Sequence, residues 1–367
     1  MKKILIVNPF GIGDVIFSTP LVDILKKNFP DSYIGYLCNR RVSELIATNP
    51  CLDKIFVYEK DDYRDAWRLS KIEFAKKILA LLKSIKKERF DVSIDLTLNY
   101  QYSMFLKLLG VRRRLGFNYR NRGKFLTDRI DMEGFDDKHV IEYYLDVLKL
   151  LDIDTDKYEI EPRIYASPIG LKFADRVLKE NGMRESDQLI GMLPGCGESW
   201  GEDAGYRRWP GRNFAVLADM LVENYGARII LLGNQKETGL CGAVAAAMKN
   251  HILNYCGKTT IDQFLGILKR CSVVITNDGG PLHMAVGLGV KTISIFGPVD
   301  ENVYGPYGNK HNHIALSKKG LPCRPCYRRF KYAKCEKRVC LDLVTAEEVF
   351  RAAQGLLSRE NGKIETK

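Results

Sequence analysis

The chain has 367 residues, of which 46% are hydrophobic and 28% charged, a composition typical of a soluble protein with two domains. No segment approaches the ~20 consecutive apolar residues that a membrane-spanning helix needs. The apolar run near the start is broken by Asn8, Pro9 and Gly11, which favours a buried strand over a secretion signal. We therefore expect a cytoplasmic protein.

The first half of the chain alternates strand and helix patterns. Short apolar runs predict buried strands over 2–8, 32–38, 54–59 and 90–96. Apolar residues at helical spacing predict helices from Thr19 onward, over 66–88 and over 102–109. Such alternation is typical of a doubly wound α/β domain with a parallel sheet.

The second half repeats this alternation after a segment, 159–170, that contains two prolines and has no helical period. Strands are predicted over 188–195, 227–234, 272–280 and 291–298, with helices between them. We place one domain over 1–165, a second over 166–344, and a terminal helix and tail over 345–367. We expect two facing Rossmann-like domains with a cleft between them, with ligands beyond the carboxyl ends of the strands.

The loop after the first predicted strand carries two glycines and an acid. Gly11 and Gly13 permit close backbone approach by a ligand, and Asp14 follows directly. The third glycine of the dinucleotide-binding fingerprint is missing, which disfavours an oxidoreductase. Asp14 is either a cap for the next helix or a general base, and from the residues alone both interpretations stay open.

A second loop, after the strand over 272–280, combines Asp278 with Gly279, Gly280 and a following helix that begins near Pro281. The amides at the start of a helix form an anion site, so a diphosphate fits there. A plain strand-to-helix turn is the alternative, and His283 alone is more often an interior histidine than a catalyst.

The third loop runs from Pro194 to Ser199 and contains Gly195, with Arg207 and Arg208 downstream. Backbone donors and a nearby cation could neutralise phosphate. Gly, Glu and Ser also favour a flexible surface loop, so that alternative stays open.

Basic residues cluster over 112–129 and again over 324–338, within a net charge of +12. Such clusters attract phosphates or carboxylates on an acceptor. No nucleic-acid-binding motif is present, so we favour an anionic, membrane-borne acceptor and expect no nucleic acid partner. Arg113, Arg120 and Arg122 are the candidate acceptor contacts, although an ordinary solvated surface would also explain each of them.

Four of the ten cysteines cluster near the end of the chain. Cys323 and Cys326 have the spacing of a zinc-ligand pair, whereas Cys335 and Cys340 are spaced more loosely than usual. Structural zinc, a disulfide and free thiols all stay open, with free thiols favoured for a cytoplasmic chain.

Nearly the whole chain resembles glycosyltransferase family 9, the bacterial heptosyltransferases. The most specific segments are ILIVNPFGIGDVIFSTPL at the start and CSVVITNDGGPLHMAVGLGVKTISIFGP in the second half, with GMLPGC and RRWPGRNFAVLADML between them. The resemblance implies a GT-B type fold, inversion at the anomeric carbon, and transfer of heptose from ADP-heptose to a lipopolysaccharide core acceptor of the lipid A–Kdo type. It implies no required cofactor. Peripheral contact with the inner membrane surface is expected.

The resemblance also implies roles for single residues, which are carried over by position. Asp14 would be the base, and Gly13 would lie beside the donor. Arg207, where the family usually has a lysine before Trp-Pro, would contact the donor phosphate. The remaining donor-binding candidates are Gly195, Glu237 at the ribose, Thr259 and Thr260 near the adenine, and Asp278, Gly279, Gly280 and His283 at the diphosphate. Gly279 departs from the threonine of many members.

Two alternatives to this function stay open. One is a family 9 transferase that uses another nucleotide sugar or acceptor, and the other is a non-catalytic relative that binds an ADP-sugar.

Overall fold

A computed structural model describes residues 2–184, 186–197, 201–333, 335 and 337–361 of the chain. The chain divides into two compact units, Met1–Pro162 and Arg163–Lys367, and each is described by itself. The boundary expected between residues 165 and 166 lies in the same irregular segment, which covers 160–167.

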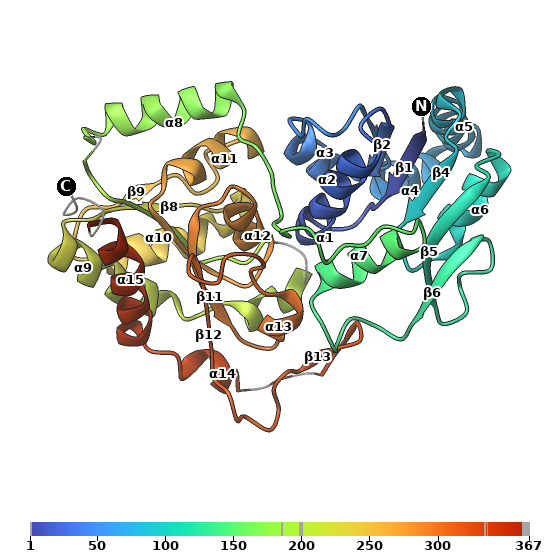
Figure 1. The fold of residues 1–367 in the computed structure, drawn as a ribbon. Helices are drawn as coiled ribbons and strands as arrows, with labels where there is room; N and C mark the ends of the chain where they lie inside the picture. The colour runs from blue at the N-terminus through green and yellow to red at the C-terminus, as the bar shows by residue number, and fades with distance from the viewer. Residues whose placement is uncertain (1, 185, 198–200, 334, 336, 362–367) are drawn as a thin grey trace. The chain divides into compact units, whose positions relative to one another are not determined.

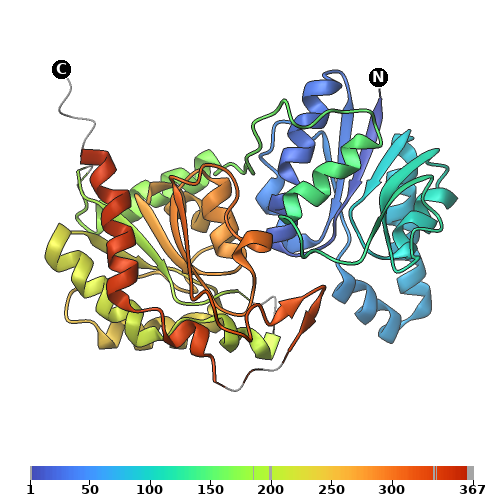
Figure 2. The ribbon, with the colours of Figure 1, turned by 60° about the horizontal axis from the view of Figure 1, so that its bottom comes forward.

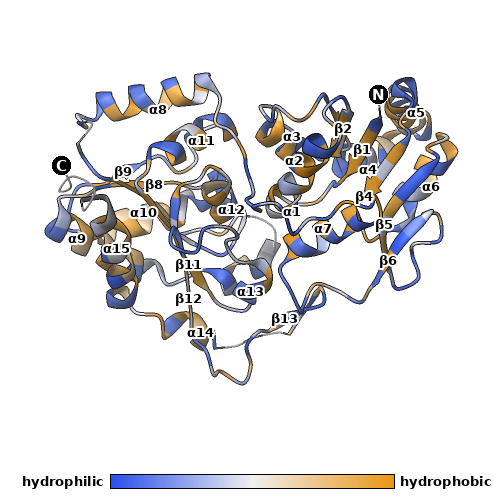
Figure 3. Ribbon diagram, in the orientation of Figure 1, coloured by the Kyte–Doolittle hydropathy of each residue, from blue (hydrophilic) through white to orange (hydrophobic). Residues whose placement is uncertain are grey.

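The N-terminal unit is built on a six-stranded parallel sheet with the order β3-β2-β1-β4-β5-β6 (Figure 1). Its strands are β1 (Lys3–Val7), β2 (Tyr33–Cys38), β3 (Lys54–Val57), β4 (Val92–Asp95), β5 (Arg113–Tyr119) and β6 (Asp128–Met132). The central strands are buried on both faces, as a parallel sheet requires. Figure 3 shows the hydrophobic residues concentrated along β1 and β4.

Helices cover both faces of this sheet. They are α1 (Ile12–Phe17), α2 (Thr19–Asn28), α3 (Arg40–Ile46), α4 (Lys60–Leu69), α5 (Lys71–Glu88), α6 (Tyr100–Leu108) and α7 (Val140–Lys149). The helical pattern over 66–88 is confirmed but is divided between two helices, α4 and α5. The first helix ends before Ser70. The Ser70 hydroxyl accepts hydrogen bonds from the N–H groups of Ile72 and Glu73, at 3.2 and 3.4 Å, and so caps the start of α5.

The C-terminal unit repeats the arrangement, with a second six-stranded parallel sheet of order β12-β11-β10-β7-β8-β9. Its strands are β7 (Leu189–Leu193), β8 (Arg228–Leu231), β9 (Leu253–Asn254), β10 (Val273–Asn277), β11 (Lys291–Phe296) and β12 (His313–Ser317). The two short strands β13 (Tyr327–Arg328) and β14 (Lys331–Tyr332) form a separate antiparallel hairpin.

The helices of this unit include the last helix of the chain, α15. They are α8 (Pro168–Glu180), α9 (Gly211–Tyr225), α10 (Thr238–Ala247), α11 (Ile261–Arg270), α12 (Gly280–Gly287), α13 (Glu301–Tyr304), α14 (Val339–Asp342) and α15 (Ala346–Asn361), with 3₁₀ turns η1 (Gly201–Arg207) and η2 (Gln235–Glu237). Figure 2 shows α15, in red, running alongside the sheet.

The terminal helix begins as the sequence predicts. The Thr345 N–H donates to the Glu348 carboxylate at 2.9 Å, and the Glu348 N–H donates to the Thr345 hydroxyl at 3.2 Å. This reciprocal pair satisfies two N–H groups that lack helical partners. Val349, Ala353 and Leu357 then bury the helix in the same core as β10 and β11.

The expected α/β class with two Rossmann-like domains is confirmed by these two sheets. In the described part of the chain, no helix combines the length and the apolar character that a membrane span requires.

Candidate functional site

The loop after β1 brings Asp14 to the carboxyl edge of the N-terminal sheet. Gly13 and Asp14 lie in the first turn of α1, and the Asp14 carboxylate accepts a hydrogen bond from the Gly11 N–H at 3.2 Å. The buried Asn8 side chain donates to the Asp14 carbonyl oxygen at 3.0 Å. Asp14 therefore caps the helix, and the same contacts fix its carboxylate at the edge of the sheet.

The chemistry of the Asp14 carboxylate suits proton transfer near neutral pH. Burial raises the pKa of Asp14 to about 6, and the hydrogen bond from Gly11 opposes that rise. A carboxylate with this pKa is ionised at pH 7 yet more basic than an exposed aspartate, which is the combination a general base needs.

A second buried carboxyl, Asp95, lies on the neighbouring strand. Asp95 ends β4 opposite Val7 of β1 and accepts hydrogen bonds from the Thr97 N–H at 2.9 Å and the Thr97 hydroxyl at 2.6 Å. Burial raises the pKa of Asp95 to about 7. Its hydrogen bonds with Thr97 hold the turn that leads into α6. The sequence analysis passed over it, although an aspartate that closes an apolar strand run was a usable signal.

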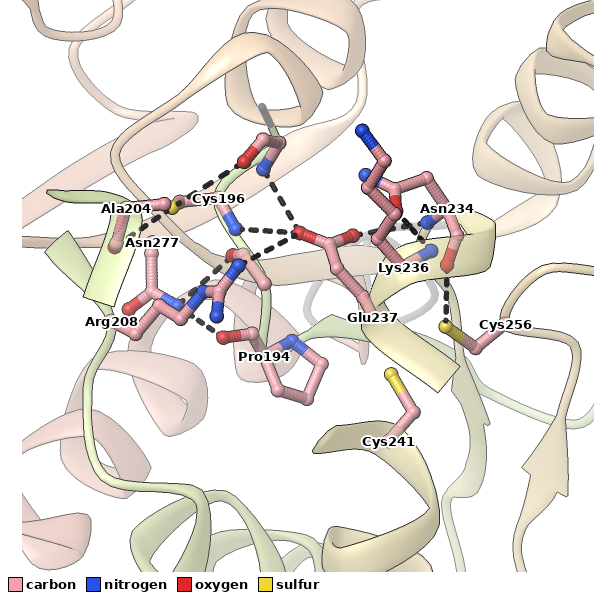
Figure 4. A network of polar contacts seen from close by, with 12 residues as sticks. Pro194, Cys196, Ala204, Arg208, Asn234, Lys236, Glu237, Cys241, Cys256 and Asn277 are labelled. Carbon is pink, nitrogen blue, oxygen red and sulfur yellow. Dashed lines mark hydrogen bonds and ion pairs between the residues drawn. The ribbon is translucent and has the colours of Figure 1, made fainter. Parts of the chain in front are cut away.

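In the C-terminal unit, Glu237 ties two loops together (Figure 4). Its buried carboxylate accepts hydrogen bonds from the N–H groups of Cys196 and Gly197, at 3.1 and 3.0 Å, and from the Asn234 N–H at 3.0 Å. The loop after β7 is thus held against the loop after β8. These contacts give Glu237 a positioning role for both loops, and its expected contact with a ribose stays a prediction. Glu198 and Ser199 lie outside the described residues.

Asn277 adds the third loop to this arrangement. At the end of β10, its side-chain amide donates to the carbonyl oxygens of Pro194 and Gly195, at 2.8 and 3.1 Å. Its oxygen accepts a hydrogen bond from the Trp209 N–H at 2.8 Å. The side chain is buried, so it fixes three chain segments at once. Asn277 was within a motif the sequence analysis singled out, but it was not chosen.

Two glycines allow these loops to approach so closely. A Cβ on Gly195 would collide with the Glu237 carboxylate, and a Cβ on Gly279 would overlap the Cys196 carbonyl oxygen. Gly279 also has a φ of +158°, with extended ψ, which side-chain-bearing residues rarely adopt. The absence of threonine at 279 therefore follows from this packing.

Arg207 and Asp278 form a buried ion pair, with Nη2 and Oδ2 2.6 Å apart. Burial raises the pKa of the Asp278 carboxyl, while the Arg207 guanidinium opposes that rise. The pair therefore links the end of η1 to the loop before α12. The structure brings these two predicted donor residues together, and each serves as the other's counter-ion.

Arg208 is the more accessible cation beside these loops. Its side chain is 31% exposed, and its Nη2 lies 3.9 Å from the Glu237 carboxylate. The Arg208 Nε is buried and has no hydrogen-bond partner in the described structure. An anion bound at the loops would satisfy that donor.

The other donor-binding candidates fall into two places. Gly280 opens α12 and His283 is buried within it, so both belong to the region around Asp278. Thr260 caps α11, where its hydroxyl accepts from the Gln263 N–H at 3.3 Å, and Thr259 precedes it in the loop after β9.

The three arginines predicted to contact the acceptor differ in their surroundings. Arg113 donates from Nε and Nη2 to Asp128 at 3.3 and 3.1 Å and also to the Leu150 carbonyl oxygen. It therefore ties β5 to β6. Arg120 and Arg122 are exposed in the β5–β6 loop, with their guanidinium carbons 4.9 and 5.8 Å from the centre of the Tyr119 ring.

The four clustered cysteines lie around the β13–β14 hairpin and are free thiols. The Cys326 thiol donates to the Cys323 carbonyl oxygen at 3.0 Å, and burial, aided by its thiol neighbours, raises the pKa of Cys326 to about 11. Among the described residues, no group of Cys, His, Asp or Glu has an arrangement that could hold a metal ion.

Comparisons with known proteins agree with this architecture. The model of "Glycosyltransferase family 9 (heptosyltransferase)" matches residues 78–335. The chain is 26% identical over 363 residues to lipooligosaccharide heptosyltransferase 2 of Campylobacter jejuni subsp. jejuni serotype O:2, which covers 98% of this chain and 99% of that protein.

Two solved structures share the fold over nearly their full lengths. The structure of E. coli ADP-heptose lps heptosyltransferase II has a TM-score of 0.75 at 20% identity, covering 98% of this chain and 100% of that one. The glycosyl transferase family 9 protein from Veillonella parvula DSM 2008 has a TM-score of 0.79 at 22% identity, with coverages of 98% and 97%. Because the family model spans well over half of the sequence, the chain belongs to glycosyltransferase family 9 and is a transferase.

Proposed function

We propose that this protein is an inverting heptosyltransferase that moves heptose from ADP-heptose to a lipopolysaccharide core acceptor of the lipid A–Kdo type. Family membership and the full-length likeness to a protein named lipooligosaccharide heptosyltransferase 2 support this assignment. The observation that carries the donor part is the convergence of the β7, β8 and β10 loops, joined by Glu237 and Asn277.

The donor diphosphate would lie against the first turn of α12. The first N–H groups of a helix have no helical acceptor and carry partial positive charge. Gly279 and Gly280 open this turn, and the N–H groups that follow are the ones a phosphate would meet. By family position, Thr259 and Thr260 would lie near the adenine and His283 beside the diphosphate.

Arg208 is the cation best suited to the departing ADP. Arg207 already neutralises the buried Asp278, whereas Arg208 is partly exposed and lies 3.9 Å from its nearest carboxylate, that of Glu237. Negative charge grows on the diphosphate as the glycosidic bond breaks, and a fixed guanidinium stabilises that charge. Arg207 then acts by positioning Asp278 and the start of α12.

Asp14 would act as the general base. Its carboxylate takes the proton of the acceptor hydroxyl while that oxygen bonds to the anomeric carbon. The bond to ADP breaks on the opposite face, through a transition state with oxocarbenium character, so the configuration inverts. The backbone contacts around Asp14 hold the carboxylate in place for this transfer.

The acceptor would be recognised by exposed cations of the N-terminal unit. Arg120 and Arg122 project from the β5–β6 loop and are exposed, so they can meet phosphates or carboxylates. Arg113 would support this loop through its pairing with Asp128 without touching the acceptor. A lipid-linked acceptor would place the enzyme at the inner face of the cytoplasmic membrane.

A panel of candidate ligands tests the donor assignment. Melting temperatures are measured with ADP-heptose, ADP, UDP-N-acetylglucosamine and NAD; a ligand at about 100 times its Kd adds about 2.7 kcal/mol of stability. We expect ADP-heptose and ADP to stabilise the protein. Stabilisation by UDP-N-acetylglucosamine or NAD alone would contradict the proposal.

A further inference from the structure

Four large apolar side chains are exposed together on α4 and α5. Leu69 is 85% exposed, Ile72 68%, and Trp67 and Leu79 each 53%. Leu69 and Ile72 flank the Ser70 break between the helices, and the Trp67 ring packs edge-on against Phe74 of α5 at 5.1 Å. Single exposed apolar residues are ordinary, but a contiguous group marks an interaction surface.

The exposed face of α5 carries both apolar and basic residues along its length. Ile72, Lys76, Leu79 and Lys83 follow at intervals of four, three and four residues, which places them on one side of a helix. All four are exposed, whereas Ile85 on the other side is buried in the core of the N-terminal unit. Figure 3 shows hydrophobic and hydrophilic residues mixed along α5.

The charge of residues 66–87 is mostly positive, whereas the N-terminal part of α4 also carries Asp61, Asp62 and Asp65. Between residues 66 and 87 there is a single acid, Glu73. The cations of the same segment are all exposed and are Arg68, Lys71, Lys76, Lys77, Lys83, Lys86 and Lys87. The Lys71 ammonium lies 5.7 Å from the centre of the Trp67 ring, so basic and apolar groups are interleaved.

We propose that this surface, the α4–α5 patch, docks on an anionic lipid bilayer. Lysines attract anionic headgroups, and Trp and Leu side chains enter the boundary between headgroups and acyl chains. A nucleic acid would use the cations but leave Leu69 and Ile72 in water. A second copy of the chain would set one basic patch against another. The combination of groups therefore fits a lipid surface best.

The helix that leads into the patch, α4, starts at the edge of the sheet that carries Asp14. The β1, β2 and β3 strands are parallel neighbours, and α4 begins at Lys60, shortly after β3 ends at Val57. The start of α4 and the loop of Asp14 thus share the carboxyl edge of this sheet. This inference deepens the proposed function, because docking there would bring a lipid-borne acceptor to the edge with the proposed base.

Vesicle co-sedimentation of the full chain, without any donor, tests the patch. We expect binding to vesicles of phosphatidylethanolamine with phosphatidylglycerol, little binding to phosphatidylcholine vesicles, and weakening by salt. The double variant Lys76→Glu/Lys83→Glu should lower the partition coefficient by roughly 25-fold or more, since each lysine near an anionic surface contributes roughly fivefold. Leu69→Ser/Ile72→Ser should lower the partition coefficient several-fold at both low and high salt.

The matched control lies on α8 of the other unit. Lys172→Glu/Lys179→Glu makes the same change in net charge on another exposed helix and should alter vesicle binding less than about twofold. Thermal unfolding, measured without vesicles, should be unchanged in all variants and reports that they fold.

Failure of wild-type binding, equal binding to phosphatidylcholine, or an equal loss in the α8 control would overturn the docking surface. Failure of the proposed function is a separate result. Normal vesicle binding with no response to ADP-heptose would leave the patch standing and remove the donor assignment.

Discussion

The substitution Glu237→Gln tests whether one buried carboxylate shapes the donor loops. The carboxylate accepts three backbone N–H groups, from Cys196, Gly197 and Asn234. Hydrogen bonds to a charged acceptor contribute roughly 1.5–3 kcal/mol each, or roughly 4–9 kcal/mol together before the cost of burying the charge. Glutamine has nearly the same shape but one oxygen fewer.

The variant therefore keeps two hydrogen bonds at best, and each bond to the neutral amide oxygen contributes about 1 kcal/mol. Its NH₂ group faces a buried N–H, and that unsatisfied donor costs about 1–3 kcal/mol. The lower cost of burying a neutral side chain offsets part of this loss. We expect the free energy of unfolding to fall by about 3 kcal/mol, which corresponds to a melting temperature about 6–12 °C lower for a unit of this size.

The assay combines thermal unfolding with calorimetric titration of ADP. Because the displaced loops are those proposed to hold the donor, the Kd for ADP should rise at least about tenfold, a change of about 1.4 kcal/mol. Glu223→Gln, on the exposed side of α9 in the same unit, is the control and should change stability by less than about 0.5 kcal/mol. A melting temperature and an ADP affinity equal to those of the control would refute the reasoning.

Three further predictions follow from the same contacts. Asp14→Asn should abolish transfer with ADP affinity retained, and wild-type kcat/KM should rise with pH through about 6, the raised pKa of Asp14; near-normal turnover of the variant would rule Asp14 out as the base. The folded-state pKa exceeds the unfolded value of about 3.9, so the stability contributed by Asp14 is present below about pH 4 and lost as pH rises through about 6. The melting temperature of Asp14→Asn should therefore rise relative to that of wild type between pH 4 and 7. Gly279→Ala should lower stability by about 2 kcal/mol or more, because its Cβ overlaps the Cys196 carbonyl oxygen, while Gly239→Ala, with open space in α10, should be neutral or stabilising; equal melting curves would contradict this packing. Arg207→Met should cost about 3–5 kcal/mol by leaving the Asp278 carboxylate buried and unpaired, and Arg207→Met/Asp278→Asn should recover part of that loss; additive losses in urea unfolding would argue against the ion pair.

Much of the fold follows from local patterns in the sequence. The central strands are continuous apolar runs, and the capping pair of Thr345 and Glu348 is a short-range signal, so both could be predicted. Strands β5 and β6 could not, because arginine and aspartate interrupt their apolar pattern, and the Arg113–Asp128 pair that joins them depends on tertiary contact. The break at Ser70 was hidden because the helical period continues across it.

The site divides in the same way. The motifs around Asp14 and Asp278 mark loops at strand ends, so their place at the carboxyl edges of the sheets could be predicted. The roles of Glu237, Asn277 and Arg207 could not, because each is set by partners 40 or more residues away, such as the 41 residues between Cys196 and Glu237. Sequence position alone does not distinguish a residue that touches a ligand from one that holds the loop behind it.

Heptosyl transfer itself is the most direct test of the proposed function. The purified protein is incubated with ADP-heptose and a heptose-free lipid A–Kdo acceptor in vesicles, and the glycolipid is analysed by mass spectrometry alongside ADP release. We predict one added heptose for each ADP released, no addition from UDP-N-acetylglucosamine, and no product from Asp14→Asn. An unmodified acceptor despite ADP-heptose binding, or transfer only from another nucleotide sugar, would contradict the account.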